Sequence, residues 1–334
     1  MTIAPTETTV LPSSEGTRRI RKAIRLADEQ LSEDHPWLAR DNAVAFGLFA
    51  GSVLTIGLIA VAWLQGVFPT LLAVLGIALA ISVLHELEHD LIHDLYLTQP
   101  LLRFGVLVTI WWAKASLDPW SRGRLHLWHH VVSGQDEDLE ERLIGMGMPW
   151  GLRRALITLL PAAGIVVLPG LLRALRARRK EGRRIPNLRG PGWHVDLVNG
   201  VLILLPFVAV GGLIAGQAWA WPLLVLWVLP NLIRHAAIVF MSANSHYVGI
   251  RRGMVMEQNQ ILDHPVFWPL QFLCWNFGAT HVVHHFFVRQ PFWRRTLVFG
   301  DVRQVMVDNG VPANEFGSFL RANQRPQPVV SEAG

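Results

Sequence analysis

The sequence predicts an all-α integral membrane protein with two transmembrane hairpins, that is, four spans, a cytosolic histidine-rich cap and interfacial helices. Of 334 residues, 51% are apolar and 16% are charged, whereas a soluble domain carries about 25% charged residues. Long apolar runs occur in two closely spaced pairs, and histidines cluster after them. With Cys274 as its one cysteine, the chain can form neither an internal disulfide nor a thiolate metal cluster.

The first pair of apolar runs covers residues 43–64 and 70–84, and the second covers 197–215 and 219–243. Three of these runs can cross a hydrocarbon core of about 30 Å, and the run 70–84, with Pro69 before it, comes close at about 24 Å. The short connection within each pair makes it a hairpin.

Residues 155–172 are apolar too, but Pro161 and Pro169 interrupt them and basic residues flank both ends, including eight Lys or Arg in 173–189. Positive charge marks the cytosolic side of a membrane segment. We therefore expect an interfacial or re-entrant piece and not a fifth span.

The same rule orients the chain. The basic residues gather in the N-terminal arm, in the run after residue 172 and at Arg251 and Arg252, while the hairpin turns carry none. Both termini and the active site should then face the cytosol. The expected organisation is a cytosolic arm (1–42), a membrane catalytic domain (43–317) and a disordered tail (318–334).

Three histidine clusters have the spacing of metal ligands: His85-Glu-Leu-Glu-His89 with His93 one turn later, His126-Leu-Trp-His129-His130 and His281-Val-Val-His284-His285. Positions i, i+3 and i+4 share one helix face, so each cluster can direct several imidazoles to one place. Without His93, the clusters hold eight histidines. His246 ends the fourth span at the depth where the second span delivers His85, and it adds a ninth donor. Nine donors exceed the capacity of one first-row ion and imply two, which spacing alone leaves as Fe, Zn, Cu or Ni.

The order of hairpin, two boxes, hairpin, single histidine and third box resembles the membrane fatty acid desaturase and hydroxylase superfamily over roughly residues 40–300. The first box is similar to that of alkane hydroxylases, and both later boxes follow the acyl desaturase pattern. The resemblance implies two irons (Fe2+/Fe3+) and O2 as co-substrate. It also implies these metal ligands: His85, His89, His126, His129, His130, His246, His281, His284 and His285.

A narrower similarity lies in Glu257-Gln-Asn-Gln-Ile-Leu and in the stretch from Cys274-Trp-Asn-Phe-Gly-Ala-Thr-His281 to Gln290-Pro-Phe. These motifs resemble a bacterial group that includes the fatty acid decarboxylases making terminal alkenes. The resemblance implies a multi-pass protein of a bacterial cytoplasmic membrane.

Four further residues are expected to support the ligands through hydrogen bonds: His93, Asp136, Asp138 and Asn276. Metal-bound imidazoles usually donate their second nitrogen to such partners. A solvated acidic loop is the alternative for these acids, and it fits Glu140 and Glu141 better. His93 could instead be a substitute ligand or a plain interfacial residue, and Asn276 could hold a bound water or a ligand.

Two residues are candidates for substrate contact. Arg234 lies within the fourth span, where a charge is costly and faces the protein interior. Counted along the helix it lies about 18 Å deeper than His246. A structural hydrogen-bonding role is the alternative. Trp112 belongs to an aromatic segment that could roof a substrate tunnel, although such residues often anchor a protein at the interface.

The predicted reaction is O2-dependent hydrogen abstraction from a long-chain fatty acid or acyl chain, forming an alkene. Oxidative decarboxylation to 1-alkenes and aliphatic hydroxylation are alternatives. A histidine-rich metal transporter and an intramembrane zinc protease using the HExxH pattern are the alternatives outside this class. The chain has no flavin, haem or cysteine-cluster motif, so electrons should come from a ferredoxin or rubredoxin and its NAD(P)H reductase. No nucleic-acid partner is expected.

Overall fold

The computed structural model describes residues 13–160, 192–249 and 255–325. In these ranges the chain is helical and forms no strand, apart from three isolated β-bridges. The α-helices are α1 (Ser13–Asp34), α2 (Asp41–Leu64), α3 (Thr70–Ile92), α4 (Pro100–Lys114), α5 (Pro119–Val132), α6 (Leu139–Leu143), α7 (Leu152–Leu159), α9 (Trp193–Ile214), α10 (Ala220–Leu223), α11 (Leu229–Ser245), α12 (Val255–Gln258), α13 (Trp268–Leu273), α14 (Phe277–Phe286), α15 (Phe292–Asp308) and α16 (Gly317–Leu320). Shorter turns are the 3₁₀ helices η1 (Pro36–Ala39) and η4 (Pro265–Phe267) and the π-helical turn η3 (Leu224–Val228).

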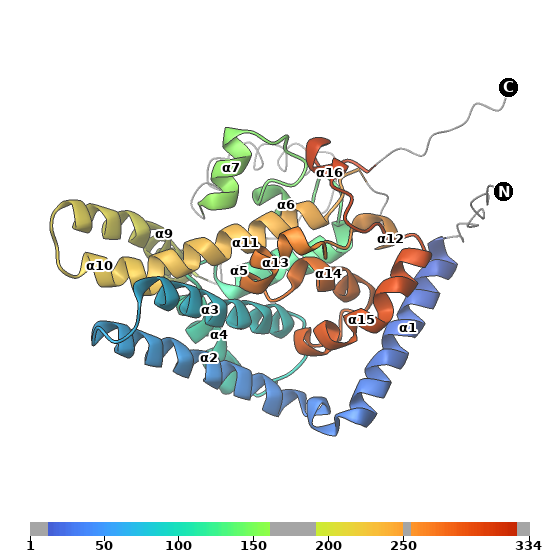
Figure 1. Ribbon diagram of the computed structural model, residues 1–334, viewed down its shortest axis with the longest axis horizontal. Coiled ribbons are helices and arrows are strands. Elements are labelled where there is room, and N and C mark those ends of the chain that lie inside the picture. The colour runs from blue at the N-terminus through green and yellow to red at the C-terminus, as the bar shows by residue number, and fades with distance from the viewer. Residues whose placement is uncertain (1–12, 161–191, 250–254, 326–334) are drawn as a thin grey trace.

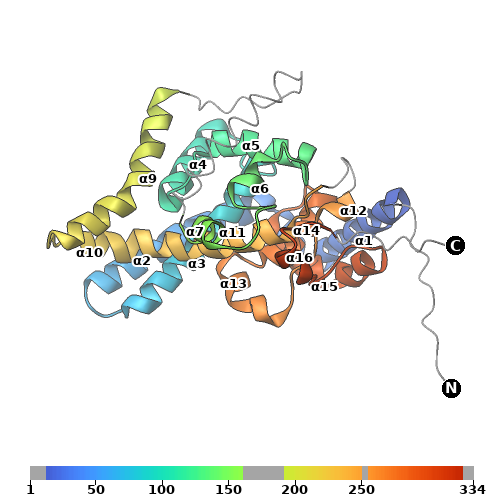
Figure 2. The same ribbon diagram turned by 90° about the horizontal axis from the view of Figure 1, so that it is seen from above.

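Within the described residues, four helices are long and apolar enough to cross a membrane: α2, α3, α9 and the continuous helix Ala220–Ser245 formed by α10, η3 and α11. They form two hairpins whose turns lie at the same end of the molecule (Figures 1 and 2). The predicted all-α membrane fold with two hairpins is confirmed.

The two hairpins each have an inner and an outer helix. In their most apolar windows α3 is 61% buried and the Ala220–Ser245 helix 50%, against 11% for α2 and 17% for α9. The inner helices pack against each other (Figure 1). The sequence before and after them therefore meets on one side of the molecule.

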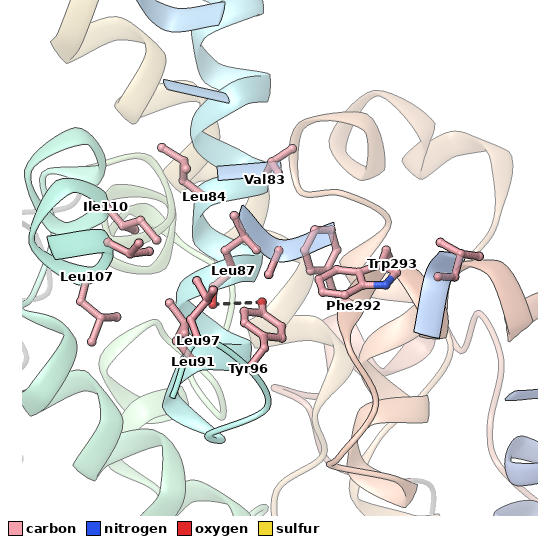
Figure 3. Close-up of a cluster of buried hydrophobic side chains, with 13 residues drawn as sticks. Val83, Leu84, Leu87, Leu91, Tyr96, Leu97, Leu107, Ile110, Phe292 and Trp293 are labelled. Carbon is pink, nitrogen blue, oxygen red and sulfur yellow. Dashed lines mark hydrogen bonds between the residues drawn. The ribbon is translucent and has the colours of Figure 1, made fainter. Parts of the chain in front are cut away.

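Helix α3 does not stop at the predicted end of the span. It continues to Ile92 through the whole first histidine box. Within this extension, Leu87 packs with Ile110 of α4 and with Phe292 and Trp293 of α15 (Figure 3). The Tyr96 hydroxyl donates to the Leu87 carbonyl at 3.4 Å. This apolar core fixes the cap helices around the end of α3.

The arm and the tail are both packed where they are described. Helix α1 lies along α15 (Figure 1), and its Ile20 and Ile24 are fully buried. Residues up to 325 remain part of the fold, since Asn323 is fully buried and Gln324 pairs with Val248. The expected disordered tail therefore does not begin at residue 318.

Most of the expected re-entrant segment, the basic run 173–189, Arg251, Arg252 and residues 326–334 lie outside the described residues.

Candidate metal centre

The histidines of the centre come from four places that the fold brings together. The first box lies on α3, the second on α5 and the third on α14. The Asp118 carboxylate caps the start of α5 by accepting from the Ser121 amide at 2.8 Å. His246 directly follows α11 in an extended conformation and forms a β-bridge with Asn259. Each cluster is thus presented by a defined helix or helix end.

The imidazoles form two groups of four. The first group is His89, His93, His126 and His284, and the second is His129, His246, His281 and His285. Within each group the potential ligand nitrogens lie within 4.8 Å of one another, and every member except the half-buried His93 is buried.

The spacing of these nitrogens fits bound metal ions. An imidazole binds a first-row ion at about 2.0–2.1 Å, so two imidazoles on one ion have nitrogens roughly 3.0–3.4 Å apart. The Nε2 atoms of His93 and His126 are 2.9 Å apart, and those of His281 and His285 are 3.0 Å apart. The buried Nε2 of His89 has no hydrogen-bond partner, so it is free to bind an ion.

Seven of the nine predicted ligands lie in these groups. An eighth, His130, borders the first group, with its Nε2 3.1 Å from that of His126 and 3.0 Å from that of His284. His85 lies outside both groups. His93, expected to support the ligands through hydrogen bonds, is itself a member of the first group.

Carboxylates contact Nδ1 of four histidines in the two groups. The Nδ1–carboxylate pairs are His89–Asp90 at 3.3 Å, His126–Glu140 at 2.8 Å, His129–Asp138 at 2.9 Å and His246–Glu141 at 3.3 Å. Such contacts orient an imidazole so that its Nε2 faces the metal.

The acidic residues after the second box do not all make the contacts predicted for them. Asp138 contacts a ligand, but the exposed Asp136 pairs with Arg142 at 2.6 Å. Glu140 and Glu141, interpreted as solvated, both contact ligands. The missing signal was the short helix α6, which begins just after Asp138 and turns these glutamates toward the histidines.

Protonation also suits metal binding. Burial, reinforced by neighbouring imidazoles, lowers the pKa of His126, His284 and His285 well below the usual histidine range, so these rings are neutral at pH 7. His129 differs: against the effect of burial, the Asp138 carboxylate raises its pKa to about 9. Metal binding at His129 would therefore release a proton.

A buried arginine that the sequence did not single out ties α15 to the first box. Arg295 donates to Glu86 at 2.6 Å and to Asp90 at 3.0 Å, and all three side chains are buried. Because Glu86 is paired with Arg295, its carboxylate is not free to act as a base.

A cavity of about 220 Å³ adjoins the histidine groups. Four histidines of the two groups, His89, His126, His129 and His281, form one part of its lining, and apolar residues such as Ile238 and Phe277 form another. A further part is basic and is contributed by Lys114, Arg122 and Arg234, next to His85, and the lining also includes Glu140 and Glu141.

Of the two predicted substrate residues, one lines the cavity and the other does not. Arg234 lines this cavity, and its Nη1 is 3.3 Å from His85 Nδ1. This contact brings Arg234 to the level of His85, so α3 and α11 do not have the register that places His246 beside His85. Trp112 is 56% exposed and does not line the cavity.

Asn276 lies at the start of α14, in a left-handed conformation (φ 58°). Its carbonyl accepts from the amides of Ala279 and Thr280 at 3.2 and 3.1 Å. Its described contacts therefore position the third box through the backbone.

Comparison with known proteins agrees with this geometry. The family model described as fatty acid desaturase matches residues 61–317, which include all three boxes, His246 and the cavity. No curated protein matches the chain. The matched region covers more than half of the sequence, and the protein is a multi-pass membrane oxidoreductase that belongs to the fatty acid desaturase family.

Proposed function

We propose that this protein is a di-iron oxidase that uses O2 to introduce a double bond into a long-chain fatty acid or fatty acyl chain. The observation that carries the proposal is the pair of four-histidine groups beside one cavity in a chain of this family. Two sites of imidazole nitrogens suit two borderline ions such as iron.

The proposed ligands follow the two groups. His89, His93, His126 and His284 hold one iron, with His130 as a further donor, and His129, His246, His281 and His285 hold the other. When bound, the irons supply the reduction of O2 and the oxidising power to remove hydrogen from an unactivated C–H bond. Asp90, Asp138, Glu140 and Glu141 keep the imidazoles oriented.

Desaturation removes two hydrogen atoms from the chain. The two hydrogen atoms, together with two electrons and two protons from outside, reduce O2 to two molecules of water. Oxidative decarboxylation of a free acid, which yields a 1-alkene and CO2, and hydroxylation, which yields an alcohol and one water, need the same external electrons. We propose that a ferredoxin or rubredoxin, reduced by its NAD(P)H reductase, donates these electrons on the cytosolic side.

Two features disfavour the alternatives from other classes. In the HExxH pattern His85 and His89 would share a zinc ion and Glu86 would be the base, but His85 lies outside the histidine groups and Glu86 is paired with Arg295. A transport site needs ligands near the middle of the spans. Here they lie where α3 and α11 end.

The test is product analysis with purified protein. We expect about two irons per chain. With labelled fatty acids, O2, a ferredoxin and its reductase, we expect a product that has two hydrogen atoms fewer than the substrate. Anaerobic samples and a His281→Ala variant are the controls and should give no product. Bound zinc with peptide cleavage, or metal flux in vesicles, would contradict the proposal.

A further inference from the structure

We propose that the basic part of the cavity is a binding site for the carboxylate of a free fatty acid. We call Lys114, Arg122, Arg234 and His85 the carboxylate subsite. The inference rests on the proposed oxidase function, because it names the head group of the substrate for the same cavity.

The charges of the subsite do not balance. Lys114 Nζ and Arg122 Nη1 both contact one oxygen of Glu88, a fully buried carboxylate. Arg234 has no such partner: among the described residues, no carboxylate pairs with it, although it is only 4% exposed. Its buried Nε makes no hydrogen bond. A buried guanidinium in this state is costly unless an anion joins it.

His85 cannot supply what Arg234 lacks. Its Nδ1 faces Arg234 Nη1 and its Nε2 faces Arg122 Nη2, each at 3.3 Å. A neutral imidazole has one acceptor nitrogen, so it accepts from one arginine at most. The other guanidinium is left facing an N–H group, which donates and does not accept.

The other acids of the cavity contact groups other than Arg234. Glu140 contacts His126 Nδ1 at 2.8 Å, and Glu141 accepts from the Ser242 hydroxyl at 2.8 Å and contacts His246. An anion from outside the chain is therefore the group that would complete Arg234.

A carboxylate fits this requirement better than an ester or thioester. Its two oxygens match the fork of a guanidinium, and its charge compensates the cation. The carbonyl of an esterified or thioester-linked chain is neutral and would leave the charge in place. The apolar lining from Ile238, Val239 and Phe277 suits the methylene chain that follows the carboxylate.

The position of the subsite also predicts where oxidation occurs. His85 and the metal-group residue His89 are one helical turn apart on α3, about 6 Å along the axis. A chain anchored beside His85 presents its first carbons, and not its middle, to the histidine groups. We expect the oxidised carbons to lie close to the carboxyl end.

The decisive experiment measures binding apart from turnover. Tritiated dodecanoate and tritiated methyl dodecanoate are bound to iron-loaded protein in nanodiscs, with protein-free nanodiscs subtracted. The wild type should prefer the acid. Arg234→Gln should weaken acid binding about tenfold to one-hundredfold, as expected for loss of a charge-assisted hydrogen bond, and leave ester binding unchanged. Arg234→Lys, which keeps the charge, should retain part of the preference.

The matched control is Arg154→Gln. Arg154 is equally buried, but it donates to the Met148 carbonyl at 2.6 Å and to Asn244 Oδ1 at 2.9 Å. Its replacement should leave the ratio of acid to ester affinity unchanged in the folded, iron-loaded fraction.

Equal binding of acid and ester by the wild type would overturn the subsite without any variant, as would a full acid preference in Arg234→Gln or oxidation confined to the middle of the chain. Failure of the oxidase proposal looks different. Protein that binds the acid selectively and carries two irons, but forms no O2-dependent product, would overturn the oxidase and leave the subsite standing.

Discussion

At the scale of single residues, the two nitrogens of an imidazole have different roles in the histidine groups. The Nε2 of His129 faces His285 at 3.3 Å, while its Nδ1 is held by Asp138 at 2.9 Å. The carboxylate fixes the ring and strengthens the facing nitrogen as a donor. The strength of His129 as a metal ligand would therefore depend on a residue that does not itself touch the metal.

Asp138→Asn is the direct test of this dependence. Loss of such a carboxylate typically weakens metal binding about 10- to 100-fold, so the variant should retain less iron when titrated with a chelator. Asp136→Asn is the matched control. Its carboxylate is exposed and pairs with Arg142, and equal iron retention by both variants would contradict the assigned role of Asp138.

His246 lies outside the three boxes and is fully buried in the second group. His246→Ala should lower bound iron below two per chain and abolish oxidation, with the protein still inserted in the membrane. Iron analysis and product formation check this. His264→Ala, in an exposed loop, should change neither, whereas full iron loading of His246→Ala would exclude it as a ligand.

His93 and His85 form a second comparison at this scale. His93 belongs to the first group, and both nitrogens of His85 face arginines. His93→Ala should therefore lose iron, and His85→Ala should keep both irons. The opposite result in iron analysis would show that binding of metal rearranges the end of α3.

At the scale of elements, the cap is tied to the membrane helices by buried ion pairs. Arg295 of α15 contacts two acids of α3 that alternate with the histidines of the first box. Helix α15 follows α14 in the chain, so this clamp places the third box over the first. Phe292 and Trp293, which precede Arg295 on α15, pack into the apolar core around Leu87 (Figure 3).

Removing one side of this clamp leaves buried acids without a cation. Arg295→Leu should lower the free energy of unfolding by about 3–5 kcal/mol, the usual cost of breaking a buried pair, seen as a lower melting temperature in detergent. Arg303→Gln removes a partly exposed arginine of the same helix, and its expected loss is about 0–1 kcal/mol. Equal losses would mean that the clamp does not hold α15.

At the scale of the whole molecule, the hairpin turns lie at one end, and α1, α12 and α16 lie at the other (Figures 1 and 2). The histidine groups lie where α3 and α11 leave the hairpins. One end of the molecule therefore carries the histidine groups and α1, which includes the basic residues of 18–25 (Figure 1). We propose that an acidic electron donor docks there.

This arrangement predicts the topology. Because the basic segments mark the cytosolic side of an even number of spans, a reporter fused to the C-terminus should be active in the cytosol. A fused alkaline phosphatase, which needs the outer side, should be inactive. The reverse pattern would contradict the proposed orientation.

The same face predicts how turnover depends on salt. Exposed charges more than about 8 Å apart are largely screened at 0.15 M ionic strength. Oxidation supported by an acidic ferredoxin should therefore slow as salt rises above this value, while iron content stays constant. Turnover that does not change with salt would argue against docking on this face.

The sequence by itself determined the features that depend on spacing along one helix. Apolar run length predicted the four spans, and the i, i+3 and i+4 pattern predicted that the histidines of one box would share a helix face. It did not predict that His126 and His129 of one box would enter different groups. Tertiary structure alone decided what depends on how helices cross. The register of α11 against α3 places Arg234, and not His246, beside His85. The end of α3 turns His93 into the first group, and α6 brings Glu140 to His126. A periodic pattern defines the face of one helix, but the register between two helices is set by the packing of side chains from both.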